Sequence, residues 1–155
     1  MPAPIIQGVQ VHPVAMLPDE RGLWAAILRA ADAEPRRIEQ VSVLTVYPGV
    51  VRAWRRHPTR WEYFAGVGGV SKLVLYDDRE GSPTRGALNE LYLGPRQPQT
   101  VAVPPLVYIG LKGTVNEECL LLHAATEPFD PTSPDGQLLP WDDPSVPYDW
   151  SRRDG

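Results

Sequence analysis

Short runs in which hydrophobic and polar residues alternate follow one another along the middle of the chain. The run from Ile38 to Tyr47 is rich in β-branched residues and predicts a strand. Further strands are predicted at intervals of roughly ten residues, in the runs 71–78, 87–93, 100–111 and 118–126. Short strands at this spacing, separated by turn residues, are typical of an antiparallel β-sandwich or barrel.

The stretch between Gly49 and Gly69 combines this alternation with charge. Polar and apolar residues alternate on each side of a break that begins at His57, which predicts two strands joined by a turn. In a regular strand Arg55 and His57 share a face, whereas Arg52 and Arg55 point to opposite faces. If the shared face lines the interior of a barrel, its charged residues form a site.

The two ends of the chain follow other patterns. Residues 1–18 alternate weakly and predict an edge strand that leaves the body of the domain, followed by a turn at 18–22. The run 23–31 is the most helix-like part of the chain, although it is short and a strand stays open as the alternative. After Thr126, closely spaced prolines predict irregular structure. Disorder is not expected there, because aromatic side chains bury large apolar areas and the tail carries Trp141, Tyr148 and Trp150.

Composition adds four expectations. The 155 residues suit one domain, with an N-terminal arm and turn at 1–37, a core at 38–126 and an irregular tail at 127–155. The net charge of −4 argues against general nucleic-acid binding. Neither a signal peptide nor a membrane span is apparent, so we expect no membrane partner and a cytoplasmic protein. The single Cys119 lies in an apolar run and is expected to pack in the core.

Several short motifs, weak one by one, occur in an order that resembles the dTDP-4-dehydrorhamnose 3,5-epimerases. They are Asp19-Glu20-Arg21-Gly22, Gly49-Val50-Val51-Arg52, Asp77 with Arg79, Ser82-Pro83-Thr84 with Gly86, Pro104-Pro105, Trp141-Asp142-Asp143-Pro144 and Asp149-Trp150. The resemblance covers nearly the whole chain. It implies an all-β fold, a cupin-type antiparallel jelly-roll barrel with a proline-rich C-terminal tail. It also implies a homodimer whose N-terminal strands are exchanged.

The same resemblance assigns site residues and shows where this chain departs from the family. Arg55 stands in place of the family's catalytic histidine, Glu62 in place of its lysine and His123 in place of its tyrosine. The acid that partners the family's histidine corresponds to Asp142 or Asp143, and we take Asp143 as the candidate. The nucleotide-contacting positions that match the family are Arg21, Gln40 and Arg52.

The wider cupin signature also fits the stretch from Gly49 to Gly69, with Arg55 at its first histidine position and then His57 and Glu62. Together with His123, the latter two could supply metal ligands. A permanent cation at the first ligand position would repel a divalent ion, and Ile109 replaces another of the usual histidines. We therefore expect no metal and no other cofactor.

These residues lead to two hypotheses about function. In the first, the protein is a divergent sugar-nucleotide epimerase or isomerase that moves protons on an anionic carbonyl compound, and not by ordinary 3,5-epimerisation. Arg55 then stabilises the enolate oxygen, Glu62 and His123 exchange the proton, and Arg52 anchors the anion, with His57 and Arg60 as further binding residues. In the second, the barrel binds a sugar nucleotide or small acid without catalysis.

The same side chains also have purely structural interpretations, which the sequence leaves open. The arginines of the stretch could form a solvated face with salt bridges, and His123 could be a hydrogen-bonded core histidine. Glu62 could be a base whose pKa is raised by apolar walls, or the salt partner of Arg55 or Arg60.

Overall fold

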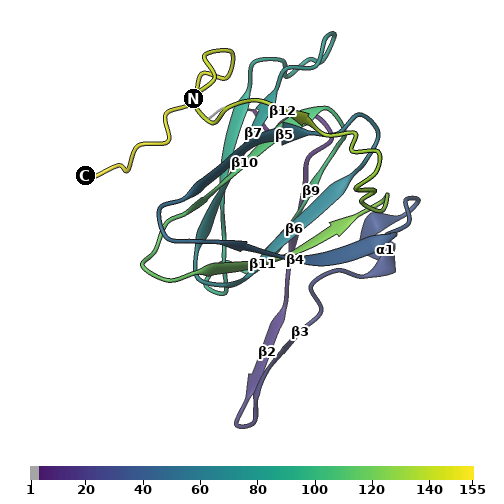
Figure 1. Cartoon of the computed structure of the whole chain (residues 1–155). Helices are drawn as coiled ribbons and strands as arrows, with labels where there is room; N and C mark the ends of the chain where they lie inside the picture. Colours follow the sequence, from purple (N-terminus) through teal and green to yellow (C-terminus); the bar gives the residue numbers. More distant parts are fainter. Residues whose placement is uncertain (1–3) are drawn as a thin grey trace.

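The computed structural model describes residues 4–155 and shows two antiparallel five-stranded sheets packed face to face (Figure 1). The first sheet has the order β1-β9-β6-β11-β4, formed by Gln10–Pro13, Gln99–Val103, Glu62–Gly68, Cys119–Ala125 and Gln40–Val46. The second has the order β12-β5-β10-β7-β8, formed by Gln137–Leu138, Val51–Arg56, Val107–Gly113, Ser71–Asp77 and Leu88–Leu93. A separate hairpin joins β2 (Met16–Asp19) to β3 (Gly22–Ala25), and α1 covers only Ala30–Ala33. The all-β prediction is confirmed.

The hydrophobic core lies between the two sheets, because alternate residues of each strand face inward. Phe64 of β6 and Leu121 of β11 meet Leu73 and Leu75 of β7 in this layer, and all four are fully buried. Cys119 is buried in the same layer, as expected. The regular alternation therefore fixes which polar residues of these strands also point inward.

One predicted strand is two strands that belong to different sheets. The run 100–111 is interrupted at Pro104-Pro105, where β9 ends in the first sheet and β10 begins in the second at Val107. Proline has no N–H to donate to a ladder, so two consecutive prolines end the pairing. Leu106, with a φ of 65°, completes the change of direction.

The strands on either side of His57 also lie in opposite sheets. β5 belongs to the second sheet and β6 to the first, so inward-facing side chains of the two strands meet across the interior. β5 carries one extra residue against β10, because Arg55 is opposite Ile109 whereas Arg52 is opposite Leu111. This bulge, which contains a cis Ala53–Trp54 peptide, brings Arg52 and Arg55 to the same side of the strand.

The N-terminal expectation is partly wrong. The edge strand β1 stays on the body of the domain and pairs with β9, while the hairpin of β2 and β3 projects away from it (Figure 1). Residues 1–3 of the expected strand lie outside the described residues. The helix-like run 23–31 contributes the end of β3 and only the first residues of α1. Leu23 and Trp24 are both exposed, and as consecutive residues of β3 they point to opposite sides of the strand instead of sharing a helix face.

The C-terminal tail crosses the mouth of the barrel and then covers the outer face of the second sheet. It is mostly irregular, as predicted, except that β12 pairs with β5. Beyond it, Val146 and Trp150 are buried against Trp54 and Val74. Across residues 4–155, the structure has no helix that is long and apolar enough to cross a membrane.

Candidate active site

A cavity of about 400 Å³ opens between the sheets beside the tail. Gln40 and Ser42 of β4 and His123 of β11 line it from the first sheet, and Arg55 of β5 lines it from the second. His57 and Arg60 follow β5, and residues 129–138 close the remaining wall. The barrel interior thus brings together five of the predicted site residues on its wall.

Glu62 lies behind this wall, and its carboxylate is the centre of the charged cluster. The residue is only 2% exposed. Its Oε2 lies 2.6 Å from Nε2 of His123 and 3.1 Å from Nη2 of Arg55, while its Oε1 lies 3.7 Å from Nε2 of His57. Two cationic or polar donors therefore share one carboxylate oxygen, an arrangement that holds all three side chains in fixed positions.

The pKa of Glu62 is lowered, which corrects one of the sequence-based interpretations. Burial opposes ionisation, but the hydrogen bond from His123 and the positive charge of Arg55 together outweigh it. Glu62 is therefore a carboxylate at neutral pH and the salt partner of Arg55, not a neutral acid between apolar walls. Arg60, the other suggested partner, pairs elsewhere.

Asp135 organises the opposite side of the cavity and was not predicted from the sequence. Its Oδ1 lies 3.0 Å from Nδ1 of His57 and 3.4 Å from Nη2 of Arg60. It stands in the proline-rich tail, where no periodicity connects it with residues almost eighty positions earlier. Within residues 4–155, Nε2 of His57 and Nε of Arg60 are buried without a hydrogen-bond partner. Buried polar atoms are usually paired, so both are groups to which a bound molecule could be hydrogen-bonded.

The two arginines of β5 line a second recess that adjoins the cavity. This recess has a volume of about 280 Å³, and it shares Arg55 and Leu138 with the main cavity. Arg52 donates from Nη1 to the backbone oxygen of Thr45, 3.1 Å away, and the side chain stays exposed. The bulge in β5 is the local irregularity that places both guanidinium groups here. A planar guanidinium suits phosphate or carboxylate, so the recess is chemically prepared for an anion.

The remaining predicted residues lie in three different places. Gln40 accepts a hydrogen bond from the backbone N–H of Phe129 at 2.8 Å, so it anchors the tail at the cavity rim. Asp143 does not line the cavity: it accepts hydrogen bonds from the backbone and hydroxyl of Ser145, within the tail. Arg21 sits at the tip of the projecting hairpin, paired with Asp19 at 2.6 Å. Neither residue can reach the cavity of its own chain in this arrangement.

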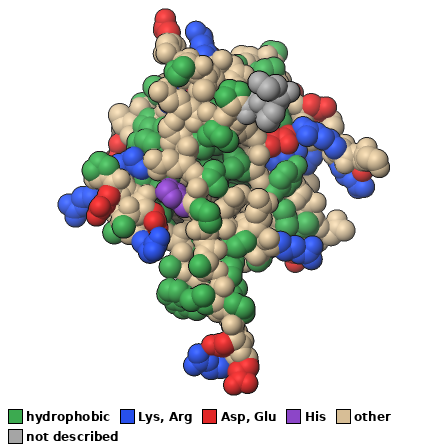
Figure 2. Space-filling view, turned by 180° about the vertical axis from the view of Figure 1, so that it is seen from behind, with side chains coloured by type: hydrophobic (Ala, Val, Ile, Leu, Met, Phe, Trp, Pro, Cys, Tyr) green, Lys and Arg blue, Asp and Glu red, His purple; other side chains and the backbone are tan. Residues whose placement is uncertain are grey.

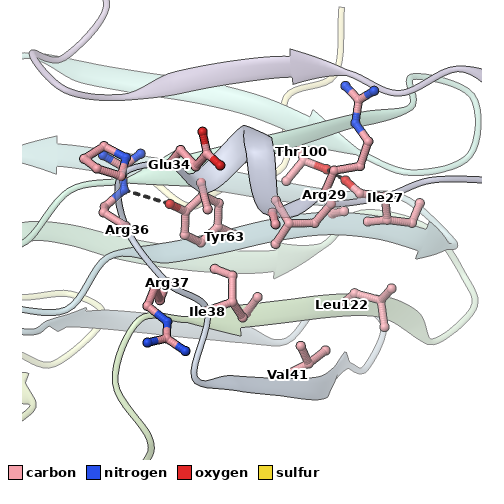
Figure 3. Close-up of a pocket in the computed structure, with 16 residues that line it drawn as sticks. Ile27, Arg29, Glu34, Arg36, Arg37, Ile38, Val41, Tyr63, Thr100 and Leu122 are labelled. Atoms are coloured by element: carbon pink, nitrogen blue, oxygen red, sulfur yellow. Dashed lines mark hydrogen bonds between the residues drawn. The ribbon is translucent and has the colours of Figure 1, made fainter.

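A larger cavity, of about 690 Å³, lies on the outer face of the first sheet. Figure 3 shows aliphatic side chains such as Ile38, Val41 and Leu122 on its floor, with arginines from the segment before β4 around it. Arg36 donates to the hydroxyl of Tyr63 at 2.9 Å. No cluster of acid and base groups comparable to that around Glu62 is found among its lining residues, so we place the chemistry in the barrel.

The described part of the chain contains no group of three or more His, Cys, Asp or Glu side chains arranged to hold a metal ion. Glu62 and the two histidines do come together, but an arginine at 3.1 Å from the carboxylate occupies the side on which a cation would bind. The donor set therefore does not fit a divalent metal.

Comparisons with known proteins identify relatives of this chain. No protein-family model matches the chain. It is 34% identical over 150 residues to the "Probable low-salt glycan biosynthesis epimerase Agl13" of Haloferax volcanii, covering 96% of each chain. It is 29% identical over 147 residues to the "Spore coat polysaccharide biosynthesis protein SpsL" of Bacillus subtilis, covering 95% of this chain and 97% of that one.

Solved structures show the same fold. A dTDP sugar isomerase from Desulfovibrio desulfuricans superposes with a TM-score of 0.88 at 29% identity, over 96% of this chain and 94% of that one. Structures described as dTDP-4-dehydrorhamnose 3,5-epimerases share the jelly roll at lower identity. From the glycan epimerase relative and this shared fold, the chain belongs to the dTDP-4-dehydrorhamnose 3,5-epimerase family of cupin jelly rolls, as a divergent member.

Proposed function

We propose that this protein is a sugar-nucleotide epimerase or isomerase of glycan biosynthesis that works by proton transfer without a metal. The observation that carries the proposal is that His123, on the wall of a cavity that Arg55 also lines, lies 2.6 Å from the buried carboxylate of Glu62. The relatives described as epimerases and as a dTDP sugar isomerase support the substrate class.

The hydrogen bond to Glu62 determines what His123 can do. Because Glu62 is a carboxylate, Nε2 of His123 donates to it, and the other ring nitrogen, Nδ1, is left as the proton acceptor. A carboxylate behind the ring also stabilises the imidazolium that forms when Nδ1 takes a proton. His123 is thus the general base in this proposal, and Glu62 is a positioning residue.

Arg55 provides the other half of the chemistry. When a C–H bond next to a carbonyl breaks, the proton goes to Nδ1 of His123 and the electron pair moves onto the carbonyl oxygen as an enolate. Only Nη2 of Arg55 is used by Glu62, so other N–H groups of the guanidinium remain to stabilise that oxygen. Return of the proton from Nδ1 of His123 to a neighbouring atom isomerises the compound. Inversion of the carbon instead requires a proton from a solvent water molecule on its opposite face, and the hydroxide so formed takes up the proton that Nδ1 of His123 holds. Arg52, His57 and Arg60 bind the rest of the anion.

Ordinary 3,5-epimerisation is not part of the proposal. A guanidinium has a pKa of about 12 or above and does not accept protons at working pH, so Arg55 cannot replace the family's catalytic histidine. General-base assistance is typically worth about 10²–10⁴ in rate. Because His123 is the single base in this proposal, we expect proton transfer at one carbon of the sugar and not at both C3 and C5.

Solvent exchange tests the proposal directly. The protein is incubated with dTDP-4-keto-6-deoxyglucose and with other nucleotide 4-keto sugars in deuterium oxide, and deuterium at C3 and C5 is followed by NMR. We expect exchange at one carbon of at least one compound, lost in His123→Ala and reduced in Glu62→Gln. Arg85→Ala, an exposed arginine in the loop between β7 and β8 that lines neither the cavity nor the recess, is the control and keeps the wild-type rate.

Two outcomes contradict the proposal. Rapid exchange at both carbons of dTDP-4-keto-6-deoxyglucose means that the site performs the family reaction after all. Binding of these compounds without exchange, weakened by Arg52→Ala, means a binding module that has lost the chemistry.

A homodimer completes the proposal. The outer face of the first sheet leaves Val41 and Val43 of β4 65% exposed, next to the open cavity of Figure 3. The projecting hairpin carries hydrophobic side chains along its length and charged ones at its tip (Figure 2); Leu17 and Trp24 are 56% and 65% exposed. We expect these exposed apolar surfaces to be buried against a second copy of the chain. In a dimer with exchanged N-terminal strands, Arg21 approaches the partner's site.

A further inference from the structure

A second charged cleft lies on the outside of the barrel. Its volume is about 540 Å³, and it is bounded by β7, β10, the loop after β10 and the end of the tail. None of its lining residues also lines the barrel cavity or the arginine recess. Lys72 and Lys112 reach it because Leu73 and Leu111, the neighbours in sequence, point into the core. The cleft is therefore separate from the proposed active site.

The charges in this cleft are of one sign. Its lining contains four basic residues, with Lys72 and Lys112 from the strands and Arg152 and Arg153 from the tail, but neither aspartate nor glutamate. The two arginines each have an acidic partner at 2.7 Å just outside the cleft. The two lysines stand directly opposite each other in the ladder, and like charges in that position destabilise a sheet. Within residues 4–155 neither lysine takes part in an ion pair.

Lys72 is the most unusual of these groups. The residue is only 6% exposed, and its ammonium makes no hydrogen bond to any of the residues 4–155. It lies over the rings of Tyr148 and Trp150, at 5.4 and 5.8 Å from their centroids. Burial lowers the pKa of Lys72, partly opposed by the negative charge of Glu90. Aromatic faces attract a cation but do not neutralise it, and the carboxylates whose charge acts on Lys72, those of Glu90 and Asp149, are not among the residues that line the cleft.

Lys112 adds a second ammonium that is held in place. It donates to the backbone oxygen of Trp150, which fixes it at the floor of the cleft. Tyr92 and Asn116 line the rim and offer further hydrogen-bond donors. Two ammonium groups on adjacent strands match the double charge of a phosphate group, and lysine binds phosphate as a point charge.

We propose that this cleft is a second anion site that binds a phosphate group, either as inorganic phosphate or diphosphate or as part of a small phosphorylated molecule. The volume admits a ligand larger than phosphate itself. Binding places negative charge between Lys72 and Lys112 and relieves the repulsion between them. The site does not depend on the proposed function, because no residue of the barrel cavity takes part.

The test is calorimetric titration at low ionic strength, where charge screening is weak, with inorganic phosphate and inorganic diphosphate as probes. We expect the double variant Lys72→Met/Lys112→Met, which keeps the length of both stems, to weaken binding about tenfold or more. Arg85→Ala, an exposed arginine that does not line the cleft, the barrel cavity or the arginine recess, is expected to leave the affinity unchanged.

Thermal unfolding gives an independent measurement on the same proteins. Phosphate should raise the melting temperature of the wild type and of Arg85→Ala, but not that of the lysine double variant, because ligands that bind only the folded state stabilise it. Without phosphate the double variant should melt at or above the wild-type temperature, which shows that it folds. Equal binding by the double variant, loss of binding in Arg85→Ala, or no binding to the wild type would overturn the proposal.

Discussion

At the scale of single residues, the structure shows why charged side chains are tolerated inside this barrel. Glu62 and Asp77 are each almost completely buried, and each is surrounded by donors from its own neighbourhood. Asp77 accepts hydrogen bonds from Arg79, Ser82 and Thr84 at 2.6–2.9 Å. A buried carboxylate with several donors is stable as an anion, and both groups accordingly have lowered pKa values.

Asp77→Asn should therefore destabilise the fold. Burial opposes ionisation of Asp77, but the hydrogen bonds from Arg79, Ser82 and Thr84 outweigh it and hold its pKa well below the ordinary value. Removing the charge leaves Arg79 without its partner, at a cost of about 3 kcal/mol. Chemical denaturation at neutral pH measures this cost. Asp78→Asn is the matched control, because its carboxylate is 41% exposed and makes only long ion pairs.

The pH dependence of that difference has a definite sign. A carboxyl group whose pKa is lower in the folded state stabilises the protein above the unfolded pKa, and this contribution is lost as the pH falls toward the folded value. The gap in unfolding free energy between wild type and Asp77→Asn should thus be constant above about pH 5 and shrink below about pH 4. A gap that widens on acidification would contradict this account.

Metal content is a further test at the residue scale. Arg55 holds a permanent charge 3.1 Å from Glu62, so protein purified without chelators should contain no stoichiometric transition metal. Elemental analysis decides the point. One iron, zinc or manganese per chain would refute the prediction and make His57, Glu62 and His123 the ligands.

At the scale of elements, the C-terminal tail packs against the outer face of the second sheet. Trp150 is 4% exposed and stacks tilted against Trp54, with ring centroids 5.1 Å apart. Gly110 of β10 makes room for it, since a Cβ there would lie 2.6 Å from the Trp150 ring. The absence of a side chain at one strand position thus decides where the tail can dock.

Trp150→Ala should cost about 3–5 kcal/mol of unfolding free energy, as expected for truncation of a buried aromatic side chain. Trp141→Ala is the matched control: its side chain is 54% exposed, and it holds Trp54 through its backbone oxygen, which the substitution keeps. Denaturation midpoints of the two variants measure the contrast. Equal losses would show that the tail does not pack as described.

Several strands could be predicted from the sequence because short apolar or alternating runs are separated by turn residues, as in β4, β6, β7 and β11. The candidates Glu62 and His123 came from the family resemblance, and the structure brings them together with Arg55. Asp135 and the two-residue β12 could not be predicted, since irregular chain has no periodicity from which to infer its neighbours. The helix-like run at 23–31 misled because its apolar residues, which would suit a helix face, instead lie partly in the projecting hairpin, where Leu23 and Trp24 are exposed.

At the scale of the whole molecule, the outer face of the first sheet exposes apolar side chains of β4, among them Val43 at 65%. Val43→Asp should disrupt the proposed homodimer, because it places a charge where apolar strands meet. Val50→Asp is the control: it is 43% exposed in the loop before β5, on the other sheet. Light scattering at micromolar protein should give a dimer for the wild type and the control, and a monomer for Val43→Asp. A monomeric wild type would remove the basis of this prediction.

The shared carboxylate at the centre of the barrel also constrains how such a protein can change over evolutionary time. Arg55 and His123 both depend on Glu62, and Glu62 in turn is an anion only because they are present. Replacing Arg55 or His123 alone removes one of the partners that keep the buried Glu62 charged, and leaving a buried charge without its partner typically costs about 3–5 kcal/mol, a large part of a domain's total stability. A lineage that moves between this trio and another catalytic set must therefore change several positions together, or first accumulate stability elsewhere. Intermediates with one substitution are the ones that selection removes.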